Sequence, residues 1–317
     1  MNSMQHGSLG LFPSLYCDDC FYDILARYFE HSGHMTSRAT SIELFHSTPD
    51  LRASVVLPYR ANLVYDWFGA DSNISMETLR DYHSAWQYLQ LSFYVSENDL
   101  SPIIRADIKP GRRRQSKMIS MLQRNLSHLR YCPICMVIDN LKMGEPFWHQ
   151  SHQLYGVKYC PYHGVPLVDS HISLSRRIKC YVSATSVFSS SSEYDMIEFG
   201  RESKNHINDP YYDSYMSLAK IICWLLGNAS SLGNHDQIIQ LYATGIGKSV
   251  PEIPSGQECL DYLYQAWPEG FLKDVFLEEH VLNELECGGL QTLPPLGHAL
   301  LIGALSMNHA LNIDYKT

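Results

Sequence analysis

The stretch LRYCPICMVIDNLKMGEPFWHQSHQLYGVKYCPYHGVPL, residues 129–167, contains two proline-bearing turns that carry metal-binding side chains. A two-residue gap lets one turn present two ligands to the same ion, and thiolate and imidazole groups suit the tetrahedral preference of zinc. Proline restricts φ inside each turn, and Gly164 tolerates the positive φ that follows such a turn. We predict one structural Zn²⁺, with reduced free thiols as the alternative. The predicted ligands form a C-x2-C-x24-C-x2-H pattern: Cys132, Cys135, Cys160 and His163.

Two further histidines, His149 and His152, lie between the turns and compete as ligands. Because four ligands are already supplied, we expect both at the surface or facing DNA. A catalytic zinc keeps one coordination position open, whereas this set is closed, and the sequence has no H-E-x-x-H helix. We therefore predict that the protein is not an enzyme, and an unrelated zinc-dependent hydrolase is the disfavoured alternative.

The rest of the chain predicts a mainly α protein with a small β zinc-ribbon module. CFYDILARYFEHSG (20–33) has apolar residues at i, i+3 and i+4 spacing, and Gly33 is a plausible stop. SMETLRDYHSAWQYLQLSFYV (75–95) reads as another helix, and Ser255-Gly-Gln-Glu258 has capping-box form. The predicted organisation is a helix-turn-helix-like domain at 1–105, a basic lead-in and zinc ribbon at 106–182, a polar linker at 183–209, and a helical domain at 210–317. Because the chain stops soon after its last apolar segment begins, we expect a fragment of a longer protein.

Charge is distributed unevenly along the chain. The formal net charge is −9, yet residues 105–130 hold eight Lys and Arg against one acid, Asp107, so this basic strip carries +7 and the remainder −16. A basic strip on an acidic body allows DNA contact on one face and protein contact on another. A solvated basic linker is the alternative. The predicted DNA-contacting cations are Arg112, Arg113, Arg114, Lys117 and Arg124.

Several other function classes are excluded or disfavoured. No apolar run reaches the roughly 18 residues of a membrane helix, and the N-terminus is not a signal peptide. Nine cysteines without an export signal therefore indicate reduced thiols in the cytoplasm. ATGIGKS (243–249) ends like a phosphate-binding loop, but Tyr242 occupies the place of its first glycine. Cys17 and Cys20 form another C-x-x-C, which we interpret as ordinary residues at the start of a helix.

The zinc module resembles the signature of the TniQ/TnsD family, the target-site selectors of multi-subunit bacterial DNA transposons. The resemblance lies in CP-x-C, the aromatic-Trp pair, SHQL-x-G and CP-x-HG-x-x-L, and FPSLYCDDCFYDILARYFEHSGH (12–34) is similar to the family's opening. Segments after residue 240 look like weaker family features and favour the longer TnsD type. Cys17 and Cys20 stand where the family has proline and acidic or hydroxyl residues.

The resemblance implies a zinc ribbon ligated by the four residues above, a helix-turn-helix module, and bacterial cytoplasmic localisation. It further implies binding to double-stranded DNA at an attachment site, or docking on an RNA-guided surveillance complex, and recruitment of an AAA+ ATPase transposition regulator. Two hypotheses follow: a DNA-binding target selector, and a protein–protein adaptor that never reads DNA itself.

Overall fold

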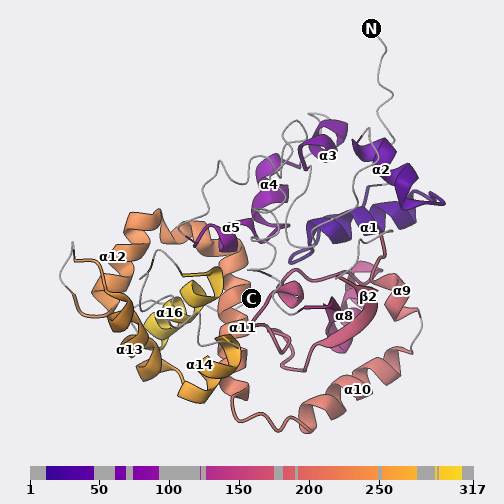
Figure 1. Cartoon of the computed structure of the whole chain (residues 1–317). Coiled ribbons are helices and arrows are strands. Elements are labelled where there is room, and N and C mark those ends of the chain that lie inside the picture. The colour runs from indigo at the N-terminus through magenta and orange to yellow at the C-terminus, as the bar shows by residue number, and fades with distance from the viewer. Residues whose placement is uncertain are drawn as a thin grey trace.

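The computed structural model describes residues 12–45, 61–68, 74–92, 122, 126–174, 181–189, 192–248, 252–276, 290 and 293–308. These residues are mostly helical and include one two-stranded sheet, which confirms the predicted mainly α fold class. Figure 1 shows α5 with the C-terminal helices α11, α12, α13, α14 and α16 on the left, and α1–α4 and the module around β2 and α8 on the right. Within the described part of the chain, no helix has both the length and the apolarity needed to cross a membrane.

The N-terminal part consists of short helices. The predicted amphipathic helix is present and ends before Gly33, which has φ +67°. The single helix predicted at 75–95 is wrong, because it is interrupted between α4 and α5. The Ser84 side chain bonds the Arg80 carbonyl and accepts from the Trp86 N–H, and such local bonds compete with the helical ladder. The helices are α1 (Phe21–His31), α2 (Ser37–Phe45), α3 (Ala61–Phe68), α4 (Met76–Asp81) and α5 (Trp86–Leu89).

The predicted zinc-ribbon region contains less β structure than small hairpins require. Its two strands pair antiparallel, with Arg130 opposite Asp169, although more than thirty residues separate them along the chain. The first C-x-x-C opens a helix instead of a hairpin, because Cys132 is the N-cap and Pro133 occupies the first turn. The elements are β1 (His128–Tyr131), α8 (Pro133–Met143), the 3₁₀ turn η2 (Ser151–Gln153) and β2 (Val168–Ser173).

The polar linker predicted at 183–209 holds two helices, α9 (Thr185–Phe188) and α10 (Glu193–Asn205). Ser192 caps α10 by accepting from the Asp195 N–H, and the acidic first turn favours the helix macrodipole. Only Met196 and Gly200 are buried in α10, so its sequence lacks the apolar stripe that reveals a helix. The predicted polar linker is therefore helical over these residues.

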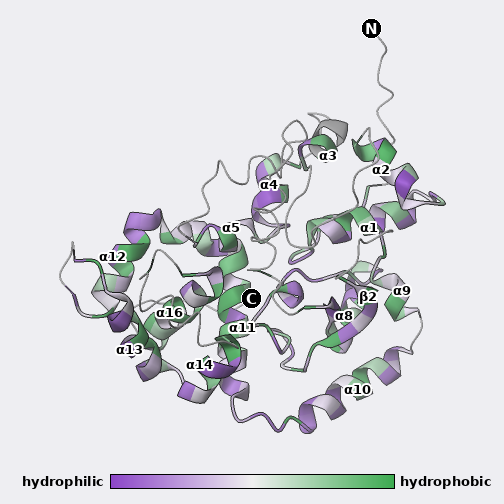
Figure 2. Ribbon diagram, in the orientation of Figure 1, coloured by the Kyte–Doolittle hydropathy of each residue, from purple (hydrophilic) through white to green (hydrophobic). Residues whose placement is uncertain are grey.

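The C-terminal part is a helical cluster around α16, which is apolar on nearly all sides (Figure 2). The predicted capping box at Ser255 is confirmed at the start of α13. Gly303 allows close packing of α16, since a Cβ there would lie 2.6 Å from the Ile221 side chain. ATGIGKS includes the C-terminal end of α12, not the helix N-terminus that binds phosphate. The elements are α11 (Tyr212–Asn228), the 3₁₀ turn η3 (Ala229–Leu232), α12 (His235–Gly245), α13 (Gly256–Ala266), α14 (Glu269–Phe276) and α16 (Pro295–Met307).

Two large cores lie on the two sides of the molecule. One joins α1–α4 to Leu129, Met136 and Trp148 of the module around the cysteines. The other joins the C-terminal helices to α5 and to Leu154, and α11 packs against both α5 and η2. The segment between the two turns therefore contributes side chains to both cores, which fixes the position of the turns.

Candidate metal centre

The first turn is built by the start of α8. The Cys132 side chain accepts a hydrogen bond from the Cys135 N–H at 3.4 Å, and Pro133 needs no acceptor for its missing N–H. Cys132 and Cys135 thus project from one helical turn, and both side chains are buried. The C-x-x-C spacing of the first turn is therefore produced by the N-terminus of a helix.

The second turn is a tight loop that starts at Cys160. Its carbonyl accepts from the Gly164 N–H at 2.8 Å, and its own N–H donates to the Val165 carbonyl at 2.8 Å. Gly164 has φ +67°, and a side chain there would collide with the Tyr212 hydroxyl. The predicted need for glycine at this position is confirmed, and His163 is held on the same side of the loop as Cys160.

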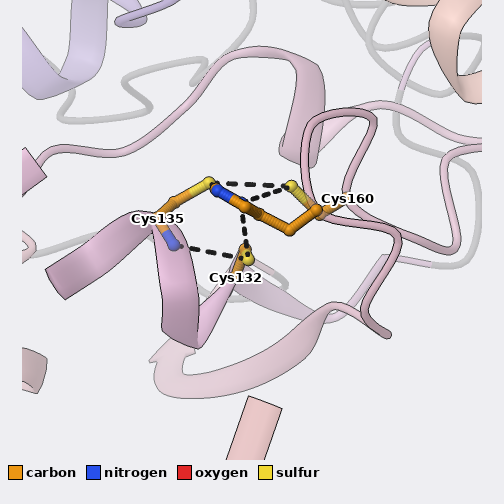
Figure 3. A group of neighbouring side chains, drawn as sticks. Cys132, Cys135 and Cys160 are labelled. Carbon is orange, nitrogen blue, oxygen red and sulfur yellow. Dashed lines mark hydrogen bonds between the residues drawn. The ribbon is translucent and has the colours of Figure 1, made fainter. Parts of the chain in front are cut away.

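The structure brings the four predicted ligands together, and Figure 3 shows the three cysteines converging from two segments of the chain. The Nδ1 atom of His163 lies 3.6, 3.2 and 3.6 Å from the Sγ atoms of Cys132, Cys135 and Cys160. The Sγ atoms of Cys135 and Cys160 are 3.6 Å apart. With Zn–S near 2.3 Å and Zn–N near 2.0 Å, a regular tetrahedron has edges of about 3.5 to 3.8 Å. The donor set therefore fits a zinc ion.

The electrostatics of the cluster also fit a cation. Burial raises the pKa values of Cys135 and Cys160 well above that of a free thiol. For Cys132, burial acts in the same direction, but hydrogen bonds from its neighbours outweigh it and lower the pKa. Because neighbouring thiolates repel one another, only one of the three buried cysteines is ionised in the absence of a metal. A divalent cation would offset this repulsion and allow all three to be thiolates.

His149 is buried, not at the surface as the sequence analysis expected. Its Nδ1 lies 3.1 Å from Asp18 Oδ2 and its Nε2 lies 2.8 Å from Asp139 Oδ2. Burial lowers its pKa, but the hydrogen bonds to Asp139 and Asp18 prevail and raise it to about 10. The surface prediction failed because the compensating carboxylate of Asp18 is supplied from 131 residues away.

His152 is also buried, with 1 % of its surface exposed, so the expectation of a surface or DNA-facing side chain is wrong again. Its ring lies 4.6 Å from the ring of His149, centroid to centroid. Burial, and then the positive charge of His149, lower the pKa of His152 to about 3. One ligand atom each of Cys135, His149 and His152 lies within 4.8 Å of the others, so the two histidines adjoin the predicted metal ligands.

Sequence reasoning missed Asp18, which connects the N-terminal turn to Ser151 and to Tyr162 of the second metal turn. Its carboxylate accepts from the Ser151 N–H at 2.9 Å, from the Ser151 hydroxyl at 2.5 Å and from the Tyr162 hydroxyl at 3.0 Å. Asp18 also adopts φ +67°, which is uncommon for a residue other than glycine. The Asp-Asp pair inside YCDDC was the available signal, but its partners are distant in sequence.

A second missed feature is the buried ion cluster around Arg27, the arginine of the LAR motif. Its guanidinium donates to Asp19 and to Asp23 at 2.6 Å each, and to Glu145 at 3.0 Å. Arg27 and both aspartates are fully buried. The i, i+4 spacing of Asp23 and Arg27 was visible in the sequence, but it did not reveal burial.

Cys17 and Cys20 take no part in the metal cluster found among the described residues. Cys20 is the buried N-cap residue of α1, in agreement with the interpretation as a helix start, and Cys17 is exposed. Arg130, at the end of the basic strip, points inward and donates to the carbonyls of Leu154 and Val157 at 2.9 and 2.7 Å. The predicted DNA-contacting cations lie outside the described residues: Arg112, Arg113, Arg114, Lys117 and Arg124.

The segments that build this centre are also those that a known family shares. A scan against protein-family models matches TniQ over residues 11–167. This chain belongs to the TniQ family. The match begins just before the Asp18 turn and ends just after the second metal turn, so it contains all four predicted ligands. A search of curated proteins found no match. TniQ membership identifies the chain as a transposition-associated targeting protein.

Proposed function

We propose that this TniQ protein selects the target of DNA transposition by binding attachment-site DNA and recruiting an AAA+ ATPase regulator, without catalysing a reaction itself. The observation that carries the proposal is the family match over 11–167, which includes the complete Cys132, Cys135, Cys160 and His163 cluster. We further propose that this cluster holds one structural Zn²⁺. Four protein donors complete a tetrahedron and leave no position for a substrate, so the metal would support structure.

The DNA-binding part of the proposal rests on charge. The basic strip ends within strand β1, which leads directly into Cys132, so the metal turn would anchor one end of the strip. Each phosphate contact releases counterions, and affinity then falls with salt with a slope of roughly −0.9 per contact. The test is fluorescence anisotropy of this chain on attachment-site DNA across a salt series. Replacing Arg112, Arg113 and Arg114 by alanine should reduce the salt slope by about three and weaken binding to all sequences alike.

A matched control removes three cations elsewhere. Lys142, Arg201 and Lys220 are exposed on other elements, so their alanine variant loses the same charge without touching the strip. If both triple variants lose the same affinity, the loss comes from the change in net charge and not from contacts made by the basic strip. A wild-type protein that fails to bind DNA even at low salt would overturn the DNA-binding part of the proposal.

A second candidate function, an adaptor that links an RNA-guided complex or another targeting factor to the ATPase, is favoured by helix α10. Tyr194 and Phe199 are 73 % and 51 % exposed, which is unusual for aromatic side chains on a charged helix. Exposed carboxylates surround them: Glu193, Asp195, Glu198 and Glu202. Acidic charge around exposed aromatic groups complements a basic protein surface with an apolar pocket. ATPase recruitment that persists without DNA and is lost in Tyr194→Ala/Phe199→Ala would favour the adaptor.

A further inference from the structure

Among the described residues of the metal-centre segment, His152 is the side chain in which both polar atoms are buried without a partner, whereas Gln150 and Arg130 each leave only one such atom unpaired. Neither ring nitrogen has a hydrogen-bond partner among the described residues, although the side chain is almost fully buried. Leaving a buried polar atom unpaired is destabilising, because the atom loses its hydrogen bonds to water and gains none in return. If the side chain only filled space in the core, an apolar residue would be more stable at this position. A buried imidazole without hydrogen bonds, next to a group of metal-binding side chains, therefore indicates that the imidazole binds a ligand.

Trp148 and Gln153 of the same FWHQSHQL segment differ from His152 in this respect. The Trp148 indole N–H donates to the Val182 carbonyl at 2.9 Å. The Gln153 amide donates to the Arg130 carbonyl at 2.7 Å and accepts from the Arg130 N–H at 3.0 Å. These side chains therefore hold the fold together through contacts that are complete without any ion.

His149 adjoins Cys135 as closely as His152 does, but it cannot bind a metal in this state. Both of its ring nitrogens are hydrogen-bonded to carboxylates, of Asp18 and Asp139, so neither nitrogen is free to bind an ion. The His152 ring lies 4.6 Å from the His149 ring, and both of its nitrogens lack a partner among the described residues, so His152 offers an unengaged nitrogen within 4.8 Å of the Cys135 sulfur. His152 is thus the available imidazole on the interior side of the cluster.

We propose that His152 is a reserve ligand of the metal centre, which binds the ion in place of His163 when His163 is lost or displaced. The proposal rests on the zinc site proposed above. His163 is only partly buried on a surface turn, whereas His152 approaches Cys135 from the core. A nitrogen and a sulfur on one zinc ion lie about 3.5 Å apart, whereas the His152 nitrogen lies within 4.8 Å of the Cys135 sulfur, so its ring must move toward the cluster to bind the ion.

The test is zinc affinity, measured by competition with a chromophoric chelator, in the 317-residue wild type and in three variants: His163→Ala, His152→Phe and the double variant. His163→Ala should keep one zinc per chain with an affinity within about tenfold of wild type, because four protein ligands remain. The double variant should bind on the order of 100-fold more weakly than His163→Ala, which is about a quarter of the binding free energy of a four-ligand site. With Co²⁺, His163→Ala should retain the spectrum of a tetrahedral S₃N site, and the double variant should not. Equal zinc affinities in His163→Ala and the double variant would overturn the proposal.

A second pair of variants keeps this result interpretable if phenylalanine disturbs the fold. His163→Cys supplies a fourth thiolate, so its zinc affinity should be the same with and without His152→Phe. Loss of zinc from His163→Cys/His152→Phe would assign His152 a packing role and refute the reserve-ligand proposal. Failure of the wild type to bind zinc would instead overturn the zinc site itself, so the two failures are distinguishable.

Discussion

Replacing Arg27 by methionine should destabilise the protein strongly, because it leaves two buried carboxylates without their cation. Arg27, Asp19 and Asp23 are fully buried, and the two ion pairs have N–O distances of 2.6 Å. Breaking a buried pair from one side costs about 3–5 kcal/mol. Since a domain has a total stability of roughly 5–15 kcal/mol, this loss is a large fraction of it. Urea unfolding followed by circular dichroism measures the difference.

The size of that loss should depend on pH. Burial raises the pKa of Asp23 to about 7 even beside Arg27, so without Arg27 its pKa is higher still. Above pH 7 the native wild type releases this proton, whereas the native variant keeps it and both unfolded chains are ionised. The native variant then binds one more proton than the native wild type, so its stability falls relative to wild type as pH rises. The gap should widen by up to about 1.4 kcal/mol per pH unit between pH 7 and 8.5.

A variant that also removes the carboxylates separates charge from packing. Arg27→Met/Asp19→Asn/Asp23→Asn no longer buries unpaired charge, so it should recover more than half of the lost stability and lose the added pH dependence. A loss below about 1 kcal/mol in Arg27→Met at pH 8, or a gap that stays constant with pH, would refute the reasoning.

Three other predictions concern separate parts of the molecule. Cys132→Ser should abolish the binding of about one zinc per chain and lower the thermal midpoint, as measured by metal analysis and melting; a folded wild type without zinc would contradict it. Gly164→Ala should destabilise by about 1–3 kcal/mol in urea unfolding, because φ +67° is strained for alanine and the new Cβ meets the Tyr212 hydroxyl. Adding Tyr212→Phe should relieve the collision but not the backbone strain. Burial lowers the pKa of His298 to about 3, so the unfolded state binds a proton between pH 6.5 and 3 that the native state does not. Wild-type stability should therefore fall as pH decreases through this range, and more steeply than that of His298→Phe; parallel curves would contradict it.

Features that depend on short sequence spacing could be predicted. Two C-x2 turns determine their own geometry, so the four candidate ligands were identifiable from the sequence and lie together in the structure. The same holds for α1, whose apolar spacing and terminal glycine are local, and for the capping box of α13.

Features that depend on distant partners could not be predicted. Asp139 lies only ten residues before His149, but the burial of His149 also depends on the carboxylate of Asp18, which is 131 residues away. Helix α10 resembles a linker because few of its residues are buried, and Gly200 rests on Ile134 of α8, far away in sequence. In each case tertiary contact overrides the local pattern.

The contacts of the second metal turn explain why a structural ion is useful at this place. The Tyr162 hydroxyl bonds Asp18 of the N-terminal turn at 3.0 Å and lies 3.2 Å from the Cys223 sulfur of α11. Lys204, at the end of α10, donates to the His163 carbonyl at 2.9 Å, and Tyr212, at the start of α11, donates to the Gly164 carbonyl at 2.9 Å.

The second metal turn has little apolar surface, whereas ordering its backbone costs about 1–2 kcal/mol of conformational entropy per residue. The turn therefore needs a further interaction to hold these segments together. A tetrahedral ion would fix Cys160 and His163 against α8 and thereby orient the carbonyls and the tyrosine that the other segments bind. Although the family match ends at residue 167, α10 and α11 bond directly to residues inside it. Loss of the ion should therefore loosen the contact between the TniQ domain and the C-terminal helices before it unfolds either core.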